Sequence, residues 1–98
     1  MSQIELAPEV ADDFERILEH LLQHEVAHAE VRVDELIKAI SVLESNPLIG
    51  RLAGDGLREL VIGRQSRGYV ACYRYVQAID TVFVLAVRSQ REAGYREI

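Results

Sequence analysis

The strongest constraint in this sequence is the segment Val82–Val87, in which every residue is apolar and most are β-branched or aromatic. Successive side chains of a β-strand point to opposite faces of its sheet, so this strand is apolar on both faces and belongs in the interior of a sheet. A chain of 98 residues has a small core, because folding buries only roughly 60–65% of the surface that the unfolded chain exposes. We therefore expect helices to cover one face of this strand. The tail around Gly94, or a partner, is expected to cover part of the other face.

Two helical patterns precede this strand. Pro8 suits the first turn of a helix, and the apolar residues that follow it fall on one face at helical spacing: Val10, Phe14, Ile17, Leu18 and Leu21. A second apolar face ends before Pro47 and consists of Ala29, Val33, Leu36, Ile37, Ile40 and Leu43. We place a break near His24–Ala27, because one continuous helix of about 36 residues is unusual in so small a domain. The sequence thus predicts a hairpin of two antiparallel helices.

Segments with strand periodicity surround the helix pair. A short extended segment, Gln3–Leu6, comes first, and three strands follow the helices, at Leu57–Gly63, Tyr69–Val76 and Thr81–Arg88. Residues 46–56 contain one proline and three of the six glycines, which predicts a loop. The expected fold is α+β, in the order β-α-α-β-β-β. An N-terminal strand and a two-helix hairpin pack on a small, mainly antiparallel sheet, in one domain that spans residues 1–98.

The net charge of −5 hides two unlike halves. Residues 1–49 contain 11 acidic and 3 basic side chains, a net charge of −8, and residues 50–98 contain 5 acidic and 8 basic side chains, a net charge of +3. All eight cations of the second half are arginines, the cation preferred at desolvated protein interfaces. We interpret the acidic half as the solvated outside of the helices. The basic half is the better candidate for binding.

Cysteine usage and hydropathy point to the cytoplasm. Cys72 is the only cysteine, so it forms no internal disulfide, and no N-terminal stretch resembles a signal peptide. No apolar run approaches the roughly 18–20 residues that span a bilayer. We therefore expect a cytoplasmic protein that does not associate with membranes.

Three histidines form the one pattern suggestive of metal binding. His20, His24 and His28 are spaced by four residues, so one continuous helix would align them, and imidazoles at that spacing bind zinc or copper. The helix is expected to break before His28, and no cysteine or carboxylate completes the set at motif spacing. We therefore interpret the histidines as surface residues and expect neither a metal nor a cofactor. Cys72 lacks a nearby histidine and is interpreted as an inert thiol.

Tyrosines and arginines are interleaved in the basic half. Alternation along the strand at 69–76 places Tyr69, Tyr73 and Tyr75 on one face. Aromatic rings beside arginines stack on nucleic-acid bases or anchor protein interfaces. The alternative is that the tyrosines pack at the edge of the core while the arginines keep the surface soluble. Spacing alone does not choose between these uses.

Several segments resemble one known family. Gly56–Gly63, Arg67–Tyr75 and Val84–Tyr95 resemble the C-terminal half of the RelE/ParE toxins of type II toxin–antitoxin modules. The loop Asn46–Arg51 and the opening segment Leu6–Phe14 resemble that family as well. Each motif is loose, but their order and spacing cover essentially the whole chain, and the element order predicted above matches the fold of the family.

The resemblance implies a small cytoplasmic toxin that a cognate antitoxin neutralises in a hetero-oligomer. ParE-like members are implicated in poisoning DNA gyrase, and RelE-like members cut mRNA on the ribosome. RelE-like enzymes commonly carry an arginine on the middle strand and a histidine after the arginine of the last strand; the matching positions here are Val70 and Ser89. The resemblance thus favours a ParE-like gyrase inhibitor that is not an enzyme. The alternatives are an mRNA endoribonuclease and a non-toxic module that binds antitoxin.

No residue is a firm catalytic candidate on this basis. If the chain cleaves RNA, the resemblance makes Arg91 and Tyr95 the candidates, although the ordinary tyrosine pKa near 10 makes acid or base catalysis demanding. Residues expected to bind the target or the antitoxin are the following: Arg58, Arg64, Arg67, Arg74, Arg88, Arg91, Tyr69, Tyr73, Tyr75 and Tyr95.

Overall fold

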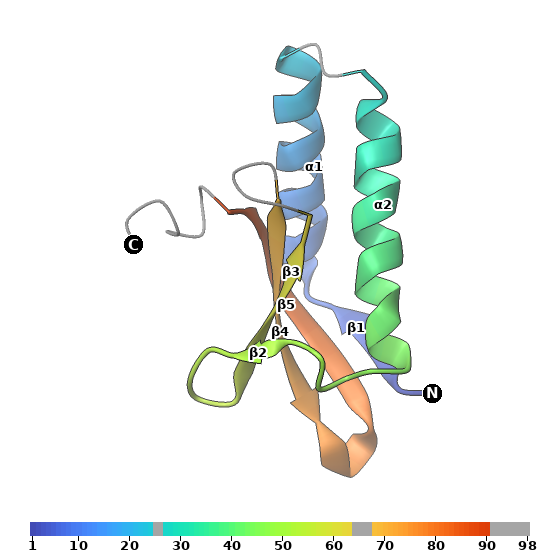
Figure 1. Cartoon of the computed structure of the whole chain (residues 1–98), viewed down its shortest axis with the longest axis vertical. Helices are drawn as coiled ribbons and strands as arrows, with labels where there is room; N and C mark the ends of the chain where they lie inside the picture. Colours follow the sequence, from blue (N-terminus) through green and yellow to red (C-terminus); the bar gives the residue numbers. More distant parts are fainter. Residues whose placement is uncertain (25–26, 64–67, 91–98) are drawn as a thin grey trace.

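The computed structural model describes residues 1–24, 27–63 and 68–90 (Figure 1). The elements, in chain order, are β1 (Gln3–Leu6), α1 (Pro8–Gln23), α2 (Ala29–Ser41), β2 (Arg51–Leu52), β3 (Leu57–Ile62), β4 (Tyr69–Val76) and β5 (Thr81–Ser89), with 3-10 turns at Val42–Glu44 and Gln77–Ile79. The predicted α+β order is confirmed. The addition is β2, a two-residue strand inside the segment that was expected to be a loop. None of the helices in these ranges is long and apolar enough to cross a membrane.

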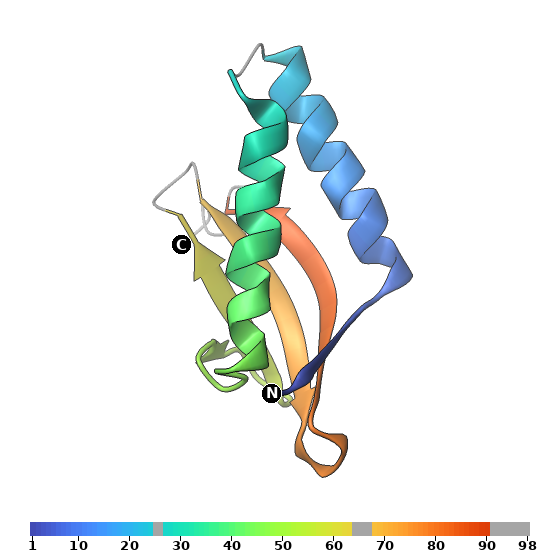
Figure 2. The same ribbon diagram turned by 90° about the vertical axis from the view of Figure 1, so that its right-hand side faces the viewer.

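The sheet has five strands in the order β1-β5-β4-β3-β2. β1 runs parallel to β5, and the other neighbouring strands are antiparallel. The apolar strand β5 lies between β1 and β4, which confirms the interior position expected from its sequence. Both helices pack on one side of the sheet, as the second view shows (Figure 2).

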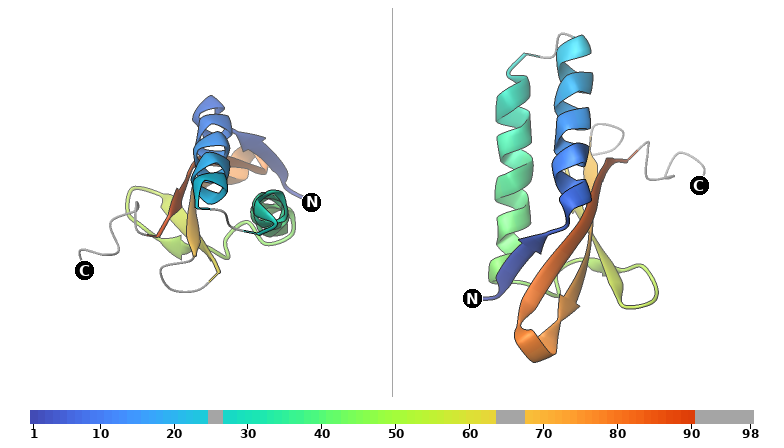
Figure 3. Two further views of the ribbon diagram at one scale, coloured as in Figure 1. Left: turned by 90° about the horizontal axis from the view of Figure 1, so that it is seen from above. Right: turned by 180° about the vertical axis from the view of Figure 1, so that it is seen from behind.

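The core lies between the helices and that face of the sheet. The helices contribute Val10, Ile17, Leu21, Leu36 and Ile40, and the strands contribute Ala71, Tyr73, Val82, Val84 and Val87. Each of these side chains is at most 6% exposed. The helix hairpin rises beyond the end of the sheet, so its far end lies away from the strands (Figure 3).

A β-bulge decides which residues of β5 enter the core. Cys72 of β4 pairs with Ala86, but the next residue, Tyr73, pairs with Val84, so Leu85 is an extra residue of β5. A bulge places two residues of one strand opposite one residue of its partner. Val84 and Val87 are therefore both fully buried although they are three residues apart. Leu85 stays exposed.

Side chains of α1 continue the hydrogen bonding of β5 beyond the end of β1. The pairing of β1 with β5 ends at Val84. Further along, Val87 N donates to Asp13 Oδ2 at 3.0 Å. Arg16 Nη2 donates to Val87 O at 3.4 Å and to Asp13 Oδ1 at 3.3 Å. A helical acid and base thus satisfy backbone groups that an edge strand would otherwise leave open.

Replacing Asp13 with alanine is expected to lower the free energy of unfolding by about 1–3 kcal/mol, because the buried Val87 N–H loses its acceptor. Asp13 is only 8% exposed, so water does not readily replace the carboxylate. Urea denaturation measures the effect. The matched control is Glu19→Ala, an exposed acid on the same helix, which should change stability by less than about 0.5 kcal/mol. Equal losses in the two variants would contradict this role for Asp13.

Candidate functional site

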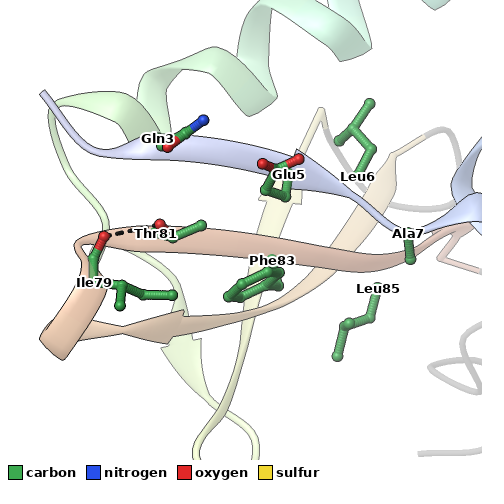
Figure 4. A pocket seen from close by; sticks show the side chains of 8 residues that line it. All are labelled: Gln3, Glu5, Leu6, Ala7, Ile79, Thr81, Phe83 and Leu85. Atoms are coloured by element: carbon green, nitrogen blue, oxygen red, sulfur yellow. Dashed lines mark hydrogen bonds between the residues drawn. The ribbon is translucent and has the colours of Figure 1, made fainter.

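An open depression of about 540 Å³ lies over the paired strands β1 and β5 and the turn before β5 (Figure 4). Phe83 alternates with the buried Val82 and Val84, which face the helices, so Phe83 faces the opposite side of the sheet. The depression is lined by Gln3, Glu5, Leu6, Ala7, Ile79, Thr81, Phe83 and Leu85. The helix hairpin therefore covers one face of the sheet, and the depression belongs to the other.

Large apolar side chains are exposed around this depression. Leu6 is 52% exposed, Ile79 61% and Leu85 37%. They come from β1, from the turn before β5 and from the bulge, so only the folded chain brings them together. Clusters of exposed apolar side chains are typical of sites that bind another protein or a ligand. We call the surface formed by Ile79, Phe83 and Leu85 the open apolar face; Leu6, which is in register with Val84, borders it from the other side of β1.

Two arginines of the predicted binding set lie on the same side of the sheet as the open apolar face. Arg74 is paired in register with Phe83, and Arg88 is paired with Val70. Val70 and Phe83 both point away from the helices, because each alternates with a core residue. Arg74 and Arg88 are exposed. They are therefore available to a partner that covers this side.

Arg58 and Tyr73 fasten a loop through hydrogen bonds. Arg58 Nη1 donates to Leu48 O at 3.0 Å and to Gly50 O at 2.8 Å, while Gly50 N donates to Tyr73 Oη at 2.8 Å. Tyr73 is 0% exposed. The two side chains fasten the loop that leads from α2 to β2. Tyr73 thus has the core-packing role that was the alternative to binding, and its ring does not reach a partner.

The other two tyrosines of β4 are half-buried. Tyr69 and Tyr75 both pack against the helix-covered core. Tyr75 Oη donates to Asp80 Oδ1 at 2.7 Å, and Ser2 Oγ donates to the same oxygen at 2.6 Å. These bonds join the start of β1 to the β4–β5 connection. The alternation predicted for β4 is therefore right, and its tyrosine face is the one that the helices cover.

The two donors act on the pKa of Asp80. The Ser2 hydroxyl and then the Tyr75 hydroxyl stabilise the charged carboxylate, which lowers the pKa of Asp80. The pKa of Tyr75 is raised, mainly because its proton is engaged with Asp80. The bonds thus favour ionised Asp80 together with protonated Tyr75, the forms present near neutral pH.

The Asp80 carboxylate is expected to make stability depend on acid pH. Its folded-state pKa is lowered, so its contribution is present above the ordinary carboxyl pKa of about 3.9 and is lost as pH falls through the lowered value. In Asp80→Asn this contribution should be absent. Urea midpoints measured from pH 6 to pH 3 should fall more steeply for the wild type than for the variant. Parallel curves would contradict this prediction.

Several residues that the sequence predicted as binding or catalytic candidates do not lie on the open apolar face or are not among the described residues. Arg64, Arg67, Arg91 and Tyr95 lie outside the described residues. Val70, at one position where RelE-like enzymes carry a catalytic group, is 3% exposed.

The other such position, Ser89, is half-buried at the end of β5, where it pairs with Tyr69. The described residues contain no cluster of three or more metal-ligating side chains. Burial and then the charge of Glu59 raise the pKa of Cys72, with Arg74 opposing them, and a raised pKa makes a thiol less reactive.

Sequence reasoning did not identify the open apolar face as a site. The apolar pattern of β5 predicted that a tail or a partner would cover part of its second face. It did not predict that Leu6 and Ile79 would lie at the border of that face. The sequence signal that could have identified this face is that Phe83 and Leu85 are apolar although the valines of the same strand already supply its core-facing side chains. No sequence signal marked the bulge, which leaves Leu85 exposed.

Solved structures of toxins share this fold. The chromosomal ParDE system of P. aeruginosa includes a chain that matches with a TM-score of 0.75 and 19% identity, over 91% of this chain and 96% of that one. The intact E. coli RelBE complex matches with a TM-score of 0.64 and 18% identity, over 91% and 96%. The isolated E. coli RelE toxin matches with 0.63 and 18%, over the full length of both chains. At these low identities the likeness shows the fold.

Family membership rests on the sequence. No curated relative matches at a significant level. The family model described as "ParE toxin of type II toxin-antitoxin system, parDE" matches residues 4–94, which is nearly the whole chain. The match includes both helices, strands β2 to β5, β1 from Ile4 onward and the open apolar face. This chain therefore belongs to the ParE toxin family of type II toxin–antitoxin systems.

Proposed function

We propose that this toxin arrests growth by inhibiting DNA gyrase and that a cognate antitoxin neutralises it. The observation that carries the proposal is the match of residues 4–94 to the ParE family. ParE-like toxins are the members of the wider RelE/ParE group that act on gyrase, as the sequence resemblance implies.

The side chains at two positions support a mode of action other than RNA cleavage. Attack of a 2′-hydroxyl on its phosphate needs a general base, a general acid and cations that stabilise the developing charge. Val70 is a buried hydrocarbon side chain, and Ser89 has a hydroxyl with no basic character near neutral pH. A RelE-like enzyme commonly carries an arginine at the first position and a histidine at the second.

The antitoxin is proposed to bind the open apolar face. This face exposes Ile79 and Leu85, with Leu6 at its border, in a domain whose helices cover only the other side of the sheet. The solved relatives include a ParDE system and an intact RelBE complex, in which a toxin of this fold is accompanied by its antitoxin. Arg74 and Arg88 on the same side would pair with acidic residues of the bound segment.

Gyrase assays test the mode of action. The purified toxin is expected to inhibit DNA supercoiling by gyrase in proportion to its concentration, and the antitoxin encoded beside it should restore supercoiling. Induced cells should form filaments and mount a DNA-damage response while bulk translation continues.

Rapid arrest of translation with cuts at codon positions in mRNA, and no effect on gyrase, would select the ribonuclease alternative. Arg91→Ala and Tyr95→Phe would then identify the catalytic group. The absence of any growth effect would leave a module that only binds antitoxin.

A further inference from the structure

Two histidines lie side by side at the end of α1, away from the open apolar face. His20 and His24 have ring centroids 4.3 Å apart, with the rings tilted by 40°. Residues four apart are neighbours on a helix surface, and His24 N donates to His20 O at 3.2 Å, so the helical spacing continues to His24. Both side chains are exposed. The end of α1 thus presents two imidazoles to solvent together.

A hydrogen bond determines which nitrogen of His24 is available. His24 Nδ1 lies 2.9 Å from His20 O. A carbonyl oxygen only accepts, so Nδ1 carries the proton and the neutral ring offers the lone pair of Nε2 to solvent. Histidines that bind metals almost always donate their other N–H to a carboxylate, a carbonyl or a water molecule, which fixes the ring in this way. The contact with His20 O therefore holds the His24 ring as the second-sphere carbonyl of a metal-binding histidine does.

We propose that His20 and His24 form a surface site for one divalent transition-metal ion, with Cu²⁺ bound most tightly. Imidazole suits copper, zinc and nickel, and the affinity of nitrogen sites for divalent ions peaks at Cu²⁺. Each metal–nitrogen bond is about 2.0–2.1 Å long, and ring centroids 4.3 Å apart are close enough for one nitrogen of each ring to reach the same ion. The described residues offer no cluster of three such ligands, and water can supply the remaining positions.

This site departs from the expectation of no metal, which rested on aligning three histidines. His28 is the N-cap of α2 and has a left-handed backbone, with φ of 58°. It is therefore outside the helical register of the other two. His20 and His24 alone suffice for metal binding, because a first-row ion can take its remaining ligands from solvent. His28 therefore serves as a matched control.

Binding is expected to stabilise the folded chain. An ion that joins His20 to His24 favours the helical spacing at the end of α1, whereas the unfolded chain holds the two rings apart. A ligand that prefers the folded state raises the unfolding temperature. For a chain of this size, an ion concentration ten times Kd is expected to raise Tm by about 5–10 °C.

Calorimetric and thermal titration with Cu²⁺, Zn²⁺ and Mg²⁺ test the site in the purified chain. One Cu²⁺ per chain should bind, Zn²⁺ should bind more weakly and Mg²⁺ should not bind. His20→Ala and His24→Ala should each weaken Cu²⁺ binding at least tenfold and abolish the rise in Tm, while His28→Ala keeps both.

Circular dichroism without metal confirms that each variant is folded, which is expected because all three side chains are exposed. Cu²⁺ binding that survives in both His20→Ala and His24→Ala would overturn the proposal. Binding that is lost equally in His28→Ala, or the absence of binding by the wild type, would overturn it too.

Discussion

Replacing Gly50 with alanine is expected to lower the free energy of unfolding by about 3 kcal/mol or more, because the new methyl group overlaps a buried ring and disturbs a buried hydrogen bond. A Cβ at Gly50 would lie 2.6 Å from both Cε1 and Oη of Tyr73 and 3.0 Å from Glu59 O. Tyr73 is fully buried and has no space to move away. Chemical denaturation measures the loss, which is a large part of the roughly 5–15 kcal/mol typical of a folded domain.

The position of the loop amplifies this effect. Gly50 N donates to Tyr73 Oη and Gly50 O accepts from Arg58, so any shift of the loop that relieves the overlap weakens both bonds. The matched control is Gly54→Ala. There a Cβ would meet nothing within 4 Å, and only the positive φ of 90° opposes alanine, at a cost of about 1 kcal/mol. If the two variants lose the same stability, contact with Tyr73 is not the cause.

Replacing Leu85 with glutamate is expected to weaken antitoxin binding about 100-fold, or about 2.8 kcal/mol. Under the proposed function, Leu85 lies in the surface that the antitoxin covers. A carboxylate buried there without a partner loses its hydration and is not compensated, a change that typically costs 2–5 kcal/mol at an interface. Calorimetric titration of the purified toxin with its antitoxin measures Kd.

Two further variants make this result specific. Ile79 lines the same depression and is 61% exposed, so Ile79→Glu should also weaken antitoxin binding. Leu52 is 71% exposed on β2, at the edge of the sheet opposite to β1, so Leu52→Glu should leave Kd unchanged. All three proteins should unfold at similar temperatures. If Leu52→Glu weakens binding while Leu85→Glu and Ile79→Glu do not, the antitoxin binds at the other edge.

Local periodicity predicted most of the elements. The apolar spacing after Pro8 and after Ala29 identified α1 and α2, and alternation identified β3, β4 and β5 to within one residue. These patterns are visible in the sequence because a helix or strand that buries one face has regularly spaced apolar residues, regardless of which element it packs against. β2 was missed because it has only two residues, and it is a strand only through its pairing with β3.

The candidate site was less predictable for a physical reason. Alternation placed Tyr69, Tyr73 and Tyr75 on one face of β4, but both faces of that strand carry apolar residues, so the pattern did not show which one the helices cover. Tyrosine suits either environment, since its ring is apolar and its hydroxyl needs only one partner. Asp80 provides that partner for Tyr75, and Gly50 provides it for Tyr73.

The sequence by itself determined the order of the helices and the longer strands, the interior position of β5 and the resemblance to the RelE/ParE toxins. These three results depend on the spacing of residues along the chain, which can be read directly from the sequence. The tertiary structure alone decided that Tyr73 is core, that the bulge leaves Leu85 exposed and that Asp13 binds the backbone of Val87. Each of these results depends on a partner distant in the chain, whose position is set only when the helices and the sheet pack together.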